Sequence, residues 1–213
     1  MNAKTKSTVG VIITICMAAL LWGYMFSPWT KGITNFWITM VCSGLSLVIV
    51  SSLFDHSWIK QCKEGTIWKQ VLLGIVIAAV LWGVFWVGDK VSQWMFGFAR
   101  PQVDLVYAMR DGYPAWAIGL LLLCIVGPAE EIFWRGYVQR TLQTKIGANV
   151  GFIVTTLVYT LIHIWSFNFM LIMAAMVAGF IWGLIYRLRP QWLLALIVSH
   201  AVWDAAVFVV FPI

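Results

Sequence analysis

The chain has 213 residues, of which 62% are hydrophobic and 10% are charged. Water-soluble domains are roughly half apolar and a quarter charged, so this composition excludes an ordinary soluble fold, which could not cover so much apolar surface. The net charge of +6 comes mostly from Lys and Arg at the ends of apolar segments, a pattern that favours membrane topology over a nucleic-acid partner.

Seven apolar segments are long enough to cross about 30 Å of hydrocarbon as helices. Because lipid offers no partner for an open backbone hydrogen bond, helices are the expected spanning structure. We therefore predict an all-α, polytopic transmembrane helical bundle with about seven spans, and a short eighth span at 94–107 is the alternative. The predicted spans are 9–26, 36–54, 71–87, 115–134, 148–165, 167–186 and 192–211.

The first apolar segment follows Lys4 and Lys6 and lacks a clear small-residue cleavage site, so we interpret it as a retained signal anchor. Counting Lys and Arg between the predicted spans gives ten on the N-terminal side of the membrane and four on the other. The positive-inside rule then places the N-terminus in the cytoplasm and the C-terminus outside. We expect an integral protein of a prokaryotic plasma membrane.

The segment 88–112 interleaves acidic and basic residues with aromatic ones, which is typical of an interfacial segment. It divides the chain into an N-terminal part, 1–113, and a C-terminal part, 114–213. The first three predicted spans carry no charged residue, so we expect them to anchor and pack. The last four carry ionisable residues at membrane depth, where such groups are costly unless they are paired or hydrated and therefore mark a functional cavity.

Two adjacent carboxylates, Glu130 and Glu131, follow the pair Gly127-Pro128, which we expect to break or kink the helix. Arg135 lies four residues after Glu131, the helical spacing at which a guanidinium reaches a carboxylate. This pair would hold one glutamate while its neighbour faces another direction. An acidic and basic cluster at a helix end is the structural alternative.

Two histidines lie in the later spans, each four residues from a polar partner. Tyr159 and His163 share one helix face, and so do His200 and Asp204. A packing histidine and a structural hydrogen-bonded pair are the alternatives for these two sites. Taken with Glu130, the histidines are what water activation requires, namely a base for the proton and donors for a developing oxyanion.

A stripe of small residues, Ala175, Gly179 and Gly183, recurs at four-residue spacing in the sixth predicted span. We interpret it as packing between helices of the C-terminal part, with dimerisation as the less favoured alternative. Along straight helices, Glu130 and His200 would lie about 10 to 12 Å from the cytoplasmic end and His163 about 22 Å. We expect the kink at Pro128 to close this gap around a cavity that opens toward the cytoplasmic leaflet.

These residues resemble the motifs of the CPBP family of intramembrane proteases, the CAAX protease and bacteriocin-processing (Abi) family. Its pattern EExxxR stands here as Glu130-Glu131 with Arg135. Its pattern FxxxH stands as Tyr159 with His163, a departure that adds a hydroxyl, and its HxxxN or HxxxD pattern as His200 with Asp204. The resemblance covers about the last 100 residues and implies a four-helix catalytic core.

The resemblance implies that Glu130 and His163 activate a water for attack on a peptide carbonyl, while His200 and Asp204 stabilise the oxyanion. Glu131, Arg135 and Tyr159 would support them. No cofactor is required in this interpretation. Zinc is the alternative, with Glu130, His163 and His200 as ligands, although an HExxH motif is absent and the glutamate would be lost as a base.

The implied substrate is a membrane-embedded or lipidated peptide or protein, such as a prenylated CAAX tail, a pheromone or bacteriocin precursor, or a C-terminally anchored protein. The sequence leaves the oligomeric state open. A non-catalytic membrane chaperone or immunity protein is one rival, and it would tolerate Glu130→Gln and His163→Ala. A proton-coupled transporter is another, but it should show paired broken helices in repeated halves, a pattern the sequence lacks.

Overall fold

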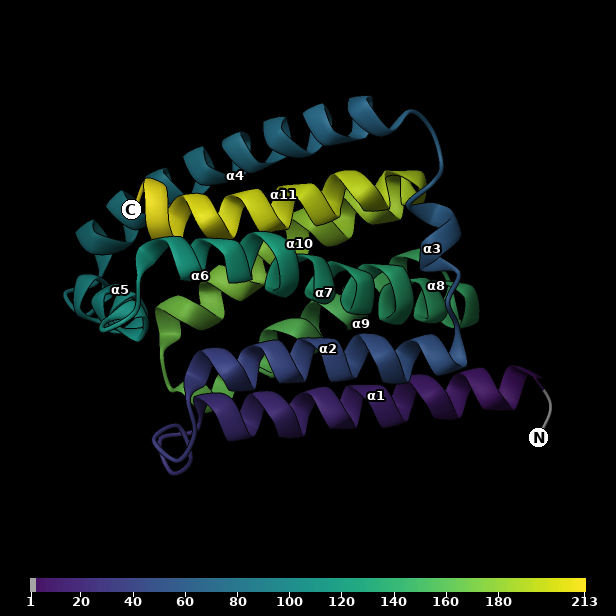
Figure 1. The fold of residues 1–213 in the computed structure, drawn as a ribbon, viewed down its shortest axis with the longest axis horizontal. Helices are drawn as coiled ribbons and strands as arrows, with labels where there is room; N and C mark the ends of the chain where they lie inside the picture. The colour runs from purple at the N-terminus through teal and green to yellow at the C-terminus, as the bar shows by residue number, and fades with distance from the viewer. Residues whose placement is uncertain (1–2) are drawn as a thin grey trace.

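The computed structural model describes residues 3–213, with side chains from Ser7 onward, and this part of the chain folds into helices without strands. Figure 1 shows the long helices running side by side along the longest axis of the molecule, with the N- and C-termini at opposite ends. The helices are α1 (Ala3–Phe26), α2 (Phe36–Phe54), α3 (Trp58–Gln61), α4 (Ile67–Met95), α5 (Ala99–Tyr107), α6 (Ala115–Leu121), α7 (Gly127–Glu131), α8 (Arg140–Ile146), α9 (Ala148–Leu161), α10 (Phe169–Leu188) and α11 (Leu193–Ala205).

Seven helical segments within residues 3–213 are long and apolar enough to cross a membrane, which confirms the predicted bundle. They are Ser7–Phe26, Phe36–Phe54, Ile67–Met95, Ala115–Ile146, Ala148–Ser166, Phe169–Leu188 and Pro190–Val210. Their outer surfaces carry large apolar side chains such as Leu20, Ile49 and Val80, each more than half exposed, as contact with lipid requires. The chain is an integral membrane protein.

The alternative of a short eighth span at 94–107 does not occur among the described residues. This region holds the end of α4, a turn and α5, whose nine residues extend only about 13 Å. The interfacial interpretation of 88–112 is also wrong for its first part, because α4 continues through Met95. It can do so because Asp89 is buried and accepts a hydrogen bond from Gln93 on the next turn, at 2.5 Å.

The fourth span continues twelve residues beyond the predicted end at 134. Arg135 and Gln139 suggested a loop, but both side chains are buried and donate hydrogen bonds to carbonyl oxygens of α10, those of Gly179 and Gly183 respectively. The bundle interior therefore supplies the partners that these polar groups need. Because Arg135 lies within the span, it is no longer one of the loop charges that set the topology.

The remaining boundaries follow local sequence signals. Asn35 and Asn168 cap the starts of α2 and α10, each accepting a hydrogen bond from the backbone N–H three residues on. Gly147 separates α8 from α9 with φ of 92°, a conformation that glycine adopts without strain, so the chain reverses there. The short connection between the fifth and sixth spans turns tightly, with Phe167 in the left-handed region.

The bundle has α4 on one side and α1 with α2 on the other, and the C-terminal helices lie between them (Figure 1). α4 packs along α11, and α2 packs against α7 and its flanking segments. The glycine stripe in α10 faces α9, since a Cβ at Gly179 would meet the ring of Tyr159 at 2.7 Å and one at Gly183 would meet Phe152 at 3.1 Å. This contact confirms the stripe as packing within the C-terminal bundle.

Candidate active site

The two glutamates lie in α7, a five-residue α-helical segment between two π-helical segments, Leu122–Val126 and Ile132–Gln139. Gly127-Pro128 was expected to break or kink the helix. The helix does not break there. Instead the turn before the proline widens, and the N–H of Gly127 donates to the carbonyl of Leu122 five residues earlier. Wide turns of this kind are frequent at functional sites, since they re-aim the side chains that follow.

Glu131 is fully buried and holds two other predicted site residues. Its Oε1 accepts a hydrogen bond from Arg135 Nη1 at 2.7 Å and contacts His200 Nδ1 at 2.8 Å. Arg135 is itself 1% exposed and lies over the rings of Tyr159 and Trp182. The spacing of four residues thus forms a buried ion pair, whose second role is to orient a histidine from α11.

Glu130 points in another direction from its neighbour and lines a cavity. Tyr159 donates its hydroxyl hydrogen to Glu130 Oε2 at 2.9 Å. Among the described side chains, Tyr159 is the one that hydrogen-bonds this carboxylate. The hydroxyl that Tyr159 adds to the phenyl ring expected at this position therefore orients the glutamate, whereas the sequence suggested only that it lay near His163.

His163 stands at the end of α9 with both ring nitrogens engaged. Nδ1 faces the backbone carbonyl of Tyr159 at 2.8 Å, and Nε2 faces Nε1 of Trp22 at 3.3 Å. A carbonyl oxygen can only accept and an indole N–H can only donate, so these partners define a neutral imidazole with its hydrogen on Nδ1. The lone pair of Nε2 is then held by a long, weak hydrogen bond.

His200 lies at mid-span in α11 between two carboxyl groups. Glu131 contacts Nδ1, and Asp204 Oδ2 lies 3.5 Å from Nε2. Trp182 of α10 stacks on the imidazole with ring centroids 4.0 Å apart, and its own N–H donates to Ser199 at 3.0 Å. The ring is thereby fixed in orientation on both edges and on one face.

Five of the predicted residues line one cavity of about 410 Å³, and Glu131 and Arg135 lie in the protein interior behind them. The cavity residues among the predictions are Glu130, Tyr159, His163, His200 and Asp204. The difference in depth between Glu130 and His163 that was expected from straight spans does not occur. It resulted from placing the end of the fourth span at 134, which is too early. With that span continued to Ile146, Glu130 lies near the middle of its helix, as His200 does in its own.

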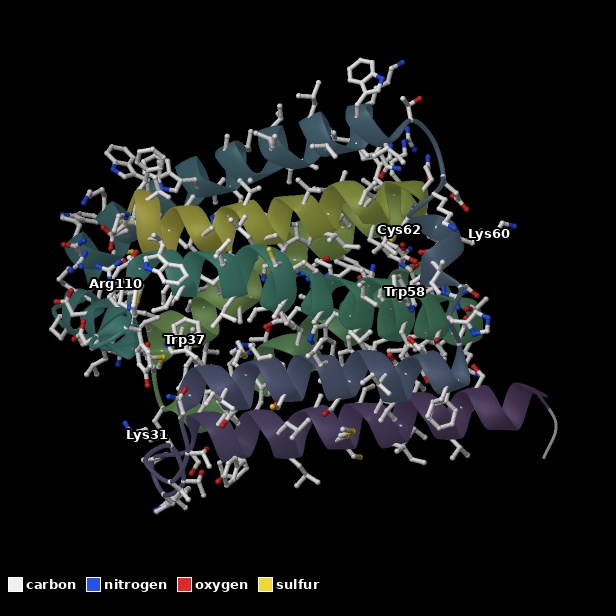
Figure 2. The ribbon with its side chains drawn as sticks, in the orientation of Figure 1. Lys31, Trp37, Trp58, Lys60, Cys62 and Arg110 are labelled. Carbon is white, nitrogen blue, oxygen red and sulfur yellow. The ribbon has the colours of Figure 1, made fainter. Side chains whose placement is uncertain are left out.

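The cavity does not open toward the cytoplasmic leaflet if the N-terminus is cytoplasmic. Its lining residues come from the half of the bundle that holds α5 and the C-terminus. Figure 2 shows Trp37, one of these residues, near that end together with Lys31 and Arg110, while Lys60 and Cys62 lie at the other. The two expectations, a cytoplasmic N-terminus and a cytoplasmic opening, are therefore incompatible.

The N-terminal helices contribute directly to this site, which sequence reasoning missed. Trp22 of α1 contacts His163, and Asp89 of α4 lines the cavity. Apolar walls come from α1 and α2, including Phe26, Phe36, Trp37 and Met40. The sequence could have indicated Asp89 as a site residue only because it is a charged residue at the end of an apolar segment. Nothing in the sequence distinguished Trp22 from other tryptophans in apolar helices.

The three residues considered as zinc ligands, Glu130, His163 and His200, are engaged with protein groups. Within the described residues, no group of three or more His, Cys, Asp or Glu side chains is placed to hold an ion. His163 and His200 each have both ring nitrogens directed at protein groups, as described above. Cys16, Cys42 and Cys124 lie exposed on the outer surface of the spans and cannot contribute.

The C-terminal region has a recognisable family. Residues 112–206 match the family described as type II CAAX prenyl endopeptidase, Rce1-like. This match bears out the resemblance drawn from the three motifs, and all seven predicted site residues fall within it. No curated protein and no solved structure matches the chain. The Rce1-like segment begins in the turn before α6, so α1 to α5 lie outside it.

Proposed function

We propose that the protein is an intramembrane endopeptidase that hydrolyses a peptide bond of a membrane-embedded or lipidated substrate with a water activated by Glu130. The observation that carries the proposal is that Glu130, oriented by Tyr159, lines the same cavity as His163, His200 and Asp204. The match of the segment to a family of endopeptidases supports the same reaction class.

The proposed reaction begins with a water held between Glu130 and His163. The water donates one hydrogen to the carboxylate and the other to His163 Nε2, where it replaces the weak hydrogen bond from Trp22. Its oxygen then attacks the carbonyl carbon of the substrate while its proton passes to Glu130. Cleavage of the C–N bond returns that proton to the leaving amine and completes hydrolysis to a carboxylic acid and an amine.

His200 is the proposed partner of the oxyanion that forms during this attack. Glu131 lies at Nδ1 and Asp204 at Nε2, so the ring is placed to offer a hydrogen on Nε2 to a substrate oxygen at the cavity. Preorganised donors of this kind cost little reorganisation during the reaction, and stacking on Trp182 fixes the ring in advance. Glu131 and Arg135 act through His200 as positioning residues.

We assign different roles to the two halves of the chain. Residues 114–213 supply the reacting groups, and residues 1–113 close the cavity and hold His163 through Trp22. The apolar walls are suited to a hydrophobic segment or lipid chain of the substrate, because they remove apolar surface from water.

The test is hydrolysis by the purified protein in detergent. Apolar peptides of random sequence are incubated with wild type, and mass spectrometry identifies pairs of products whose masses sum to that of a peptide plus one water. The same sample is analysed for bound metal. The proposal expects product pairs whose yield is independent of metal content. A sample that is folded yet yields no product pairs would refute it and favour a membrane chaperone or transporter.

A further inference from the structure

The two ends of the bundle differ in basic charge. We define the basic end as the one formed by α3, α8 and residues 187–189, and the cavity end as the one formed by α5 and residues 27–35 and 164–168. With Arg135 buried in its span, nine Lys and Arg lie at the basic end and four at the cavity end. The basic end carries Lys4, Lys6, Lys60, Lys63, Lys69, Arg140, Lys145, Arg187 and Arg189, and the cavity end Lys31, Lys90, Arg100 and Arg110. By the positive-inside rule, the basic end is cytoplasmic.

The cavity reaches only the opposite end. In α11 its lining residues run from His200 toward the C-terminus, and in α4 they run from Val84 to Ser92. His200 follows Pro190 by ten residues, so the cavity begins about 15 Å from the basic end of that span. Large buried side chains occupy the interval, among them Tyr137, Tyr186 and Leu193, each no more than 1% exposed. A substrate on the cytoplasmic side would have to pass this packed layer.

The charge within the cavity makes a second, independent distinction. The lining includes three carboxyl groups, those of Asp89, Glu130 and Asp204, and no Lys or Arg among the described residues. Three cations of the cavity end already have partners, since Lys90 lies 3.2 Å from Asp89, Arg100 pairs with Asp104 at 2.6 Å and Arg110 donates to the carbonyl of Phe208. A substrate with a free C-terminal carboxylate near the scissile bond would therefore meet three carboxyl groups and no Lys or Arg in the lining.

We propose that the substrate is an exported peptide or protein segment that enters from the non-cytoplasmic side and is cut at an internal bond, rather than a cytoplasmic CAAX tail that ends in a free carboxylate. This inference rests on the proposed function. It adds the side of the membrane from which the site is reached and the charge of the segment that it accepts.

The first experiment determines the orientation of the bundle with a membrane-impermeant maleimide. In a Cys62→Ser background, Gly32→Cys reports the cavity end, where a side chain meets nothing within 4 Å, and Thr66→Cys reports the basic end, where the native side chain makes no cap hydrogen bond. We expect Gly32→Cys to react in sealed right-side-out vesicles and Thr66→Cys only in inside-out ones. The reverse labelling would overturn the inference.

The second experiment presents substrate from one side. Random-sequence apolar peptides tethered to an impermeant dextran are added to right-side-out or inside-out vesicles, with Glu130→Gln vesicles as the blank. We expect cleavage only in right-side-out vesicles. Cleavage only in inside-out vesicles, from protein that also cleaves in detergent, overturns this inference and leaves the proposed function intact. Absence of cleavage in detergent instead refutes the proposed function, and this inference with it.

The third experiment compares end groups in detergent. For a peptide that is cut, one version ends three residues after the scissile bond in a free carboxylate and the other in an amide. We expect the amide to be cleaved with a kcat/KM at least about tenfold higher, because the cavity lining carries three carboxyl groups and no Lys or Arg. Preference for the free acid would overturn the inference.

Discussion

Glu130 and Glu131 are adjacent and both are buried, but the same isosteric substitution should destabilise the fold far more at Glu131 than at Glu130. Glu131→Gln removes the negative charge that faces Arg135 and His200 in a site with no exposure to solvent. Breaking a buried ion pair by removing one partner costs about 3 to 5 kcal/mol, because the remaining charge stays uncompensated. The new amide N–H₂ would also lie where Glu131 Oε2 already lacks a partner.

Glu130→Gln, in contrast, keeps the oxygen that accepts from Tyr159 and leaves no buried charge without its counterion. Its cost in the free energy of unfolding should be within about 1 kcal/mol. Denaturant unfolding in mixed micelles, followed by tryptophan fluorescence, measures both variants against wild type. Equal stability of the two variants, or a greater loss for Glu130→Gln, would refute the assignment of Glu131 as the structural carboxylate.

Three further predictions concern the surroundings of the site. Tyr159→Phe, which installs the family's usual residue, removes one hydrogen bond to Glu130 and should lower kcat by about fivefold or more with little change in KM, as steady-state kinetics would show; an unchanged kcat would contradict the positioning role. Gly179→Ala should destabilise the fold by about 1 to 3 kcal/mol in the same unfolding assay, because its Cβ would meet the Tyr159 ring at 2.7 Å, whereas the matched Gly83→Ala, with open space around it, should not. Burial raises the pKa of the Cys62 thiol to about 11, so its reaction with maleimide at pH 7 should be about 100-fold slower than that of an ordinary thiol and should still be rising above pH 9; a plateau below that pH would contradict the burial.

The number and order of the spans could be predicted from hydropathy alone, since each apolar run of the sequence becomes one long helix. The errors occur where polar residues extend a helix inside the bundle. Arg135 and Gln139 read as the start of a loop, and Asp89 read as the start of an interfacial segment. Hydropathy cannot distinguish a polar side chain that faces water from one that donates to a carbonyl of a neighbouring helix.

Some contacts of the candidate site could be predicted from the sequence and others could not. Contacts within one helix follow from spacing, so the pairs of Glu131 with Arg135 and of His200 with Asp204 could be expected. Contacts between helices could not, and these include the bridge from Glu131 to His200 and the bond from Tyr159 to Glu130. They depend on which helix faces which, and this was set by close approaches such as that of Gly127 to the backbone of Ala201.

The account depends most directly on Glu130 as the base that activates water. The decisive measurement is kcat for Glu130→Gln on a peptide that wild type cleaves, with both proteins shown to unfold at comparable denaturant concentrations. Loss of a general base lowers rates by about 10² to 10⁴-fold, and the account predicts a decrease in this range or beyond it. A folded Glu130→Gln variant that retains more than about a tenth of the wild-type kcat would contradict it.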